Sequence, residues 1–164
     1  MVDPECSRPS SREIGFLLAQ IGAHAASKFG ERLEALKLTP PQAGILGILD
    51  REGGLSQQTL ADLLGMFPSR LVAVLDDMER AELLERRPHP SDRRVFTLYL
   101  TVAGKKKLQA VGRVAKQHEA ELCATLNPSE RELLEKLLSR VAQDQQLRPG
   151  IHPGYRRLGE REKC

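Results

Sequence analysis

Two groups of side chains have the clearest chemical potential in this sequence. Ser69 and Arg70 directly follow Pro68, at the start of a predicted helix. Arg93 and Arg94 lie in a proline-containing loop farther along the chain. An arginine guanidinium donates hydrogen bonds in a planar fork, which suits phosphates and the edges of bases. The first turn of a helix adds unsatisfied N–H groups and the positive end of the helix dipole. These residues therefore point to nucleic-acid contact before catalysis.

The helix predicted from Pro68 to about Ala81 has one apolar and one polar side. Its apolar residues recur at helical spacing and are Leu71, Val74, Leu75 and Met78. The opposite side carries Ser69, Arg70 and Ala73, and a helix of this width fits the major groove of B-DNA. The later turns carry the acids Asp76, Asp77 and Glu79, which phosphates would repel. We therefore expect the N-terminal end to face DNA, where Arg70 contacts a base unless it is a solvated surface residue.

The loop between two predicted strands is expected to form a wing. Arginine suits a narrow, electronegative minor groove, so Arg93 and Arg94 are the expected contacts unless the loop is a solvated, charged tip. Asp92 lies two residues before Arg94 and could hold that side chain extended by a charge-assisted hydrogen bond. The preceding strand adds Arg86 and Arg87, which could either contact phosphates or be solvated.

The order of the predicted elements is typical of a winged helix-turn-helix. Helices are expected at 11–36, 40–51, 56–65, 68–81 and 101–124, and a last one starts at the capping box 127–130. Strand-like runs cover 83–87 and 95–100. We therefore expect a mainly α (α+β) fold with about six helices and a small β-hairpin wing.

Composition narrows the classes of function. The net charge of the chain is +3, so the basic segment that begins at Arg86 matters more than the total charge. No apolar run approaches membrane-spanning length and the N-terminus has no apolar signal core, so we expect a cytoplasmic protein with no membrane partner. The sequence has no Ser/His/acid order, no phosphate-binding Gly loop and no metal-ligand spacing. We therefore expect no enzyme activity, no cofactor and no metal site.

Three stretches carry a family resemblance. They are LSQQTLADLLG, LVAVLDDMERAELLERR and DRRVFTLYLT followed by AGKKKL. In this order and spacing they resemble the MarR (multiple antibiotic resistance regulator) family of bacterial and archaeal transcription factors, over about Ile14 to Val141. The resemblance implies a sequence-specific regulator, expected to be a repressor, that binds a pseudo-palindromic operator in double-stranded DNA as a homodimer.

The resemblance also implies a division of the chain. Residues 37–101 would form the DNA-binding lobe, and 11–36 and 102–146 the dimerisation helices, between a flexible tail at 1–10 and an irregular tail at 147–164. The outer helices carry more apolar surface than a small wing domain could cover, which supports a dimer, although some of their residues could pack on their own subunit. Two symmetry-related helices would then reach successive major grooves.

A signal-sensing site is a further implication, because family members often bind small phenolic or aromatic acids between the dimerisation region and the DNA-binding lobe. Phe16, His24, Phe29 and Arg86 are candidates for this pocket, although both phenylalanines could be core residues and His24 an interfacial one. Some other members sense oxidants through a cysteine, and others sense zinc. Cys123 is most simply a small buried side chain. The alternatives left open are a redox-responsive regulator and a winged-helix module that contacts proteins without binding DNA.

The sequence departs from the family pattern at three positions. Phe67 stands where Ser or Thr usually precedes the fourth helix, and it cannot cap by hydrogen bonding, so Pro68 must fix how that helix begins. Ala73 replaces a position that is often polar or basic. Glu82 stands where Gly is common before the first strand. With fewer base-reading groups, more of the specificity is expected to rest on Arg70, the wing and DNA shape.

Overall fold

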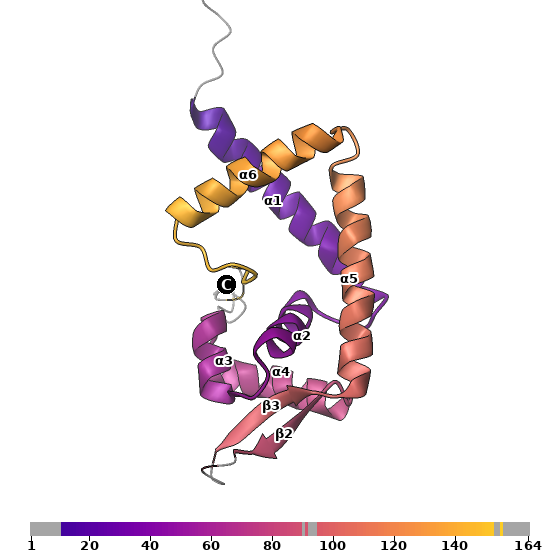
Figure 1. Ribbon diagram of the computed structural model, residues 1–164, viewed down its shortest axis with the longest axis vertical. Helices are drawn as coiled ribbons and strands as arrows, with labels where there is room; N and C mark the ends of the chain where they lie inside the picture. Colours follow the sequence, from indigo (N-terminus) through magenta and orange to yellow (C-terminus); the bar gives the residue numbers. More distant parts are fainter. Residues whose placement is uncertain (1–10, 90, 92–94, 153–154, 156–164) are drawn as a thin grey trace, which may run out of the picture.

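The computed structural model describes residues 11–89, 91, 95–152 and 155. Six helices and three short strands follow one another in this part of the chain (Figure 1). The helices are α1 (Ser11–Glu34), α2 (Pro40–Glu52), α3 (Gln57–Leu64), α4 (Pro68–Arg80), α5 (Val102–Leu122) and α6 (Pro128–Asp144). The strands are β1 (Leu55–Ser56), β2 (Leu84–Pro88) and β3 (Phe96–Leu100). The fold is mainly helical with a winged hairpin, as predicted.

The strands form one antiparallel sheet with β3 between β1 and β2. The hairpin register runs from Leu84 opposite Leu100 to Pro88 opposite Phe96. β1 is a strand that the sequence did not predict, since two residues are too few to show an alternating pattern. Its pairing with β3 joins the start of α3 to the base of the hairpin.

The hydrophobic core lies in the lobe built from α2, α3, α4 and the sheet, and α1 reaches it near its C-terminal end. Its largest fully buried side chains are Leu33, Ile45, Leu46, Ile48, Leu60, Leu64, Leu71, Leu75, Met78, Leu84 and Leu98. Burial of each side chain of this size stabilises the fold by about 1.5–3 kcal/mol. The lobe can therefore hold α4 firmly in place.

α5 links this lobe to α1. At the start of α5, the hydroxyl of Thr101 accepts a hydrogen bond from the Gly104 N–H at 2.9 Å. Gly104 lies so close to the β2 side of the lobe that an added Cβ would be 1.9 Å from the carbonyl oxygen of Leu83. Farther along, Arg32 of α1 forms an ion pair with Glu121 of α5, and this contact lowers the pKa of the Glu121 carboxyl. The two long helices are thus fixed to each other and to the hairpin.

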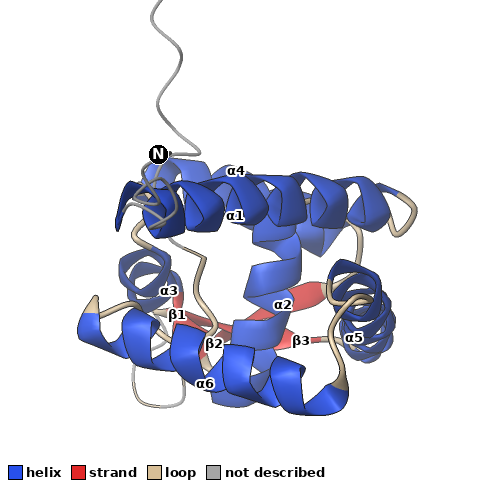
Figure 2. Ribbon diagram, turned by 90° about the horizontal axis from the view of Figure 1, so that it is seen from above, coloured by secondary structure: helices blue, strands red, loops and turns tan. Residues whose placement is uncertain are grey.

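α6 and the N-terminal half of α1 lie away from the core, and the view in Figure 2 separates these two helices. No residue of α6 is buried, and α6 packs extensively against no other described element. The exposed large apolar residues of α1 are Ile14, Phe16, Leu17, Leu18 and Ile21, and those of α6 are Leu133, Leu134, Leu137, Leu138 and Val141. Two apolar helix faces are therefore left uncovered by the described residues, and the alternative that Phe16 is a core residue is wrong within this part of the chain.

The structure moves several predicted boundaries. α1 ends at Glu34 instead of 36, and the turn that follows places Lys37 in the left-handed region with φ 54°. The capping box predicted at Asn127 is confirmed, and Thr39 forms a second capping box at the start of α2. In the segment predicted as an irregular tail, Tyr155 is half-buried against the core. Among the described helices, none combines the length and apolar character needed to cross a membrane.

Candidate nucleic-acid interface

α4 buries one side in the lobe and leaves the other accessible. The buried residues are Leu71, Leu75 and Met78. Ser69, Arg70 and Ala73, which were predicted to face DNA, are all exposed. The structure therefore brings these three predicted residues together on one accessible side.

The start of α4 has no side-chain cap. Phe67 occupies the capping position, makes no capping hydrogen bond and is 67% exposed. Pro68 fills the first helical position, where its lack of an N–H costs nothing. The N-terminal end of α4 is thus not neutralised by an acidic side chain, since its first turn contains none. This end retains the positive character that favours an anion.

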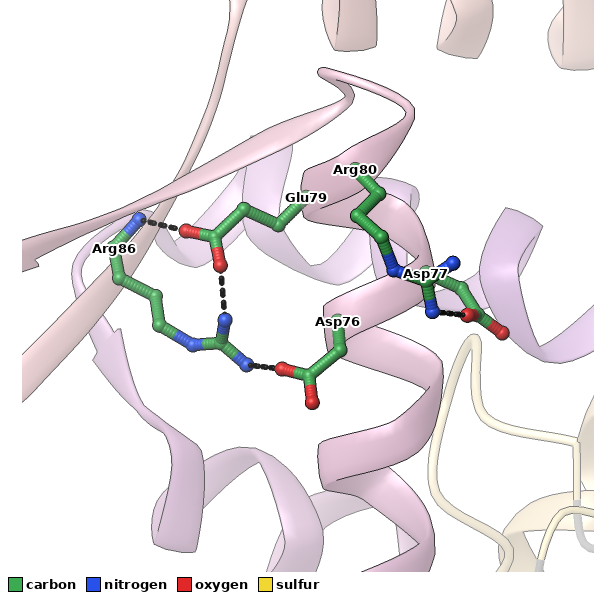
Figure 3. Close-up of polar contacts among 5 residues, drawn as sticks. All are labelled: Asp76, Asp77, Glu79, Arg80 and Arg86. Carbon is green, nitrogen blue, oxygen red and sulfur yellow. Dashed lines mark hydrogen bonds and ion pairs between the residues drawn. The ribbon is translucent and has the colours of Figure 1, made fainter.

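The later turns of α4 are tied to β2 by Arg86 (Figure 3). Its guanidinium donates to Asp76 at 2.6 Å and also pairs with Glu79. The backbone N–H of Arg86 donates to the same Glu79 carboxylate at 3.3 Å. The Arg86 side chain is 22% exposed, so this double pair is partly shielded from water. On the outer side of the helix, Arg80 pairs with Asp77.

These contacts change the assignment of Arg86. We predicted it as a phosphate contact or as part of a ligand pocket, but its charge is taken up by two carboxylates of α4. Its strand position beside the C-terminal half of α4 is the reason, because the guanidinium lies within reach of both acids. Sequence reasoning separated the acidic end of α4 from the basic segment and so missed this link. The signal was there: Asp76 and Glu79 are three residues apart and share one face.

The wing hairpin is described up to its tip. The His89 N–H donates to the Val95 carbonyl at 2.8 Å, so the ladder continues one pair beyond β2 and β3. Arg87 is exposed on β2, where its guanidinium lies 4.9 Å from the centre of the Tyr99 ring and also contacts Glu85. The predicted wing contacts Asp92, Arg93 and Arg94 lie outside the described residues.

Arg70 differs from the other arginines of this region. It is exposed and forms no ion pair with any residue that the structure describes. It also borders a cavity of about 580 Å³ that opens between α1, the start of α2 and α4. The lining is largely apolar and includes Phe29, Pro40, Met66 and Val74, with Tyr155 from the C-terminal segment. The Arg70 guanidinium therefore lies at the boundary between the accessible side of α4 and a largely apolar cavity, which His152 also lines.

The four predicted pocket residues do not converge on this cavity. Phe29 lines it and also stacks on His118 of α5, with ring centres 5.6 Å apart. Phe16 lies on the same helix thirteen residues earlier, which places it about 20 Å away along the axis. His24 is exposed and does not line the cavity, and Arg86 is held against α4. Within the single chain these four side chains do not line one cavity, because α1 is long and β2 faces a different part of α4.

The departure at Glu82 has a visible structural cost. Glu82 has φ 56°, in the left-handed region, where a residue other than Gly is uncommon. It closes the end of α4, where its N–H donates to the Glu79 carbonyl at 2.9 Å and the Leu83 N–H donates to the Met78 carbonyl at 2.9 Å. A glycine would adopt this turn with less strain.

Other chemistry has little support in the described residues. They contain no group of three or more His, Cys, Asp or Glu side chains that could hold a metal ion. Cys123 is free and half-buried, whereas Cys6 and Cys164 lie outside the described residues. Cys123 therefore has no disulfide partner within the described chain, which gives the redox alternative no support there.

Comparison with known proteins gives consistent matches. The sequence model of the MarR family matches residues 36–95. A protein of Thauera aromatica, named for transcriptional regulation of the hcr operon, is 29% identical over 130 residues, which are 79% of this chain and 78% of that protein. An HTH-type transcriptional repressor of Mycobacterium tuberculosis is 26% identical over 131 residues, or 80% of this chain and 94% of the repressor. The solved structure of the transcriptional repressor CouR bound to a 23-mer DNA duplex is 30% identical with a TM-score of 0.69, and covers 83% of this chain and 99% of that one.

The link from Arg86 to α4 predicts a stability effect. Arg86→Gln should lower the free energy of unfolding by about 1–2 kcal/mol, because it leaves two half-buried carboxylates without their cation. The measurement is urea denaturation. Arg80→Gln is the matched control, since its pair with Asp77 is more exposed, and its effect should stay below about 0.5 kcal/mol. Equal losses in the two variants would contradict a special role for Arg86.

Proposed function

Since this chain belongs to the MarR family of winged helix-turn-helix transcriptional regulators, we propose that it is a repressor that binds a pseudo-palindromic operator as a homodimer and is released by a small anionic aromatic ligand. The observation that carries the proposal is Arg70 at the uncapped start of α4, which is exposed and has no ion-pair partner among the described residues. In the proposed division, residues 37–101 bind DNA, and α1, α5 and α6 form the dimer.

Base contact is assigned to the first turns of α4. Arg70 keeps its guanidinium available, whereas Arg80 and Arg86 are paired with acids of the same helix. Ser69 and Ala73 flank Arg70 on the exposed side and would lie against the groove. The wing residues Asp92, Arg93 and Arg94, together with Arg87, are proposed to contact the adjacent backbone or minor groove.

Dimerisation is assigned to the uncovered apolar faces of α1 and α6. Isolated soluble proteins rarely expose contiguous apolar patches of this kind. A second copy is the favoured occupant because symmetric homodimers are the commonest soluble assemblies, and the resemblance to the MarR family implies a homodimer. Two copies of α4 would then be held at a fixed separation, which a palindromic operator requires.

Ligand release is assigned to the cavity beside Arg70. A largely apolar cavity bordered by the Arg70 guanidinium and the His152 imidazole suits an aromatic carboxylate, whose ring would lie against Phe29 and Met66 while its charge pairs with Arg70. The same guanidinium cannot serve the ligand and a DNA base at once. Ligand binding would therefore weaken operator binding by competing for this side chain.

The orientation of α4 predicts opposite results at its two ends. Arg70→Ala should weaken binding to a duplex selected by the wild-type protein by roughly tenfold or more, because a bidentate arginine–base contact contributes about 1–3 kcal/mol. Arg80→Ala should change affinity by less than about threefold, since its charge is already paired. The measurement is a fluorescence-anisotropy titration at several salt concentrations. Equal losses would contradict the proposed orientation, and no salt-dependent binding by the wild type would contradict DNA recognition itself.

The proposed dimer predicts a concentration-dependent mass. Wild-type protein should sediment as a species of twice the 18.2 kDa chain mass. Leu137→Glu, in the apolar stripe of α6, should shift the protein to monomer because it places a charge in the interface. Glu132→Gln, on the opposite face of α6, should leave the dimer intact. A wild-type monomer at all concentrations tested by analytical ultracentrifugation would refute the assignment.

The ligand assignment predicts selective thermal stabilisation. A series of benzoates at about ten times their dissociation constant should raise Tm by roughly 2–5 °C, and benzamide, which lacks the charge, should have little effect. The benzoate effect should be lost in Arg70→Ala. Equal stabilisation of wild type and Arg70→Ala would place the ligand elsewhere, and no stabilisation by any benzoate would remove the anionic aromatic class.

A further inference from the structure

The C-terminal segment returns from α6 to the DNA-binding lobe (Figure 1). After α6, the Arg148 guanidinium donates to the carbonyl oxygens of Asp62 at 3.3 Å and Leu63 at 3.4 Å. These carbonyls lie at the C-terminal end of α3, where a cation is favoured by the helix dipole. Ile151 is half-buried and packs against the core of the lobe. The chain thus contacts a part of the molecule that precedes it by more than eighty residues.

Beyond Ile151, Tyr155 packs against Pro40 and Gly44 of α2, and we call this contact the Tyr155 seat. Its hydroxyl donates to the Pro40 carbonyl oxygen at 3.1 Å. Its ring lies directly over Gly44, where an added Cβ would be 2.7 Å from the Tyr155 Oη and 2.9 Å from Cε2. Burial raises the pKa of the Tyr155 hydroxyl, so the group stays protonated and can donate.

Gly44 is unfavourable for α2 on its own. A glycine inside a helix destabilises it relative to alanine, and Gly44 lies inside α2 with no left-handed φ that would require glycine. The close approach of Tyr155 supplies the reason, because a larger residue would displace the ring. The close fit of Tyr155 over Gly44 and the Arg148 contacts are thus two independent observations that place the C-terminal segment against the lobe.

These contacts matter because α6 has little other support. It buries no residue and packs extensively against no other described element. Its N-terminal end is joined to α5, and its C-terminal end is held by Arg148, Ile151 and Tyr155, which we call the C-terminal clamp. The clamp therefore connects the far end of a proposed dimer helix to α2 and α3 of the DNA-binding lobe.

We propose that the C-terminal clamp is a positioning device that sets the orientation of the DNA-binding lobe relative to α6, and so the separation of the two α4 helices on DNA. This inference rests on the proposed function, since it requires a dimer that binds DNA through α4. With the clamp in place, the lobe is held from both ends of α6. With Tyr155 released, only the Arg148 and Ile151 contacts remain at this end of α6. The lobe then samples a wider range of orientations, which weakens binding to paired half-sites.

The seat is tested by a double-mutant cycle in urea unfolding, without DNA. In a Tyr155→Ala background, Gly44→Ala should lower the unfolding equilibrium constant by about fivefold, because only the gain in helix propensity remains. With Tyr155 present, the same change should give no gain or a loss, since the new methyl group displaces the ring. Gly47→Ala is the matched control: its Cβ would be 3.6 Å from Arg51 and away from Tyr155. Its effect should be the same in both backgrounds.

The positioning role is tested on a two-half-site duplex selected by the wild-type protein. Tyr155→Ala should weaken binding by roughly tenfold, while its affinity for a single half-site changes by less than about twofold. Tyr155→Phe keeps the ring over Gly44 and should lie between Tyr155→Ala and wild type. Absence of coupling between positions 44 and 155 in the cycle would contradict the contact between Tyr155 and Gly44. Wild-type affinity of Tyr155→Ala for the two-half-site duplex would overturn the positioning role. Wild-type protein that binds no duplex would instead overturn the proposed function, which separates the two failures.

Discussion

The burial of one side of α4 is the constraint on which the rest of the lobe depends. Leu71, Leu75 and Met78 are fully buried, and their contacts fix both the axis of the helix and its rotation. Because the helix cannot rotate without exposing this stripe, its opposite side must face outward. β2 adds a second fixation through Arg86, which holds the later turns. The first turns have neither a side-chain cap nor an acid, so the end that is left free is also the end that favours an anion.

The neighbours of each charged side chain in this region decide whether its charge stabilises the fold or remains available to DNA. Arg86 and Arg80 are held by carboxylates of α4, whereas Arg70 has no ion-pair partner among the described residues and stays available. Counting basic residues along the sequence therefore overstates the charge offered to DNA. Lys107 is also used within the fold, since its ammonium group donates to the Leu36 carbonyl at 3.0 Å, in the turn that follows α1.

Much of the fold could be predicted from the sequence because its signals are local. Capping boxes at Thr39 and Asn127, the proline that opens α4 and the apolar periodicity of each helix lie within a few residues of the elements they determine. The candidate site was predicted where it depends on one helix, as for Ser69, Arg70 and Ala73. It was missed where it depends on packing between elements. Periodicity does not relate the residues that meet at Arg86, at the cavity beside Arg70 or at the Tyr155 seat. β1 was missed for another reason, because it is too short to show a pattern.

Gly44 illustrates how a local defect can carry information about a distant contact. Judged within α2 alone, it weakens the helix and has no conformational reason to be glycine. Judged with the C-terminal segment in place, it makes room for Tyr155, which in turn borders the same cavity as Arg70. A ligand in this cavity would contact α4 through Arg70 and the C-terminal segment through Tyr155. The position of the lobe and the availability of its DNA-facing arginine would therefore respond to the same occupant, because both depend on side chains that line this cavity.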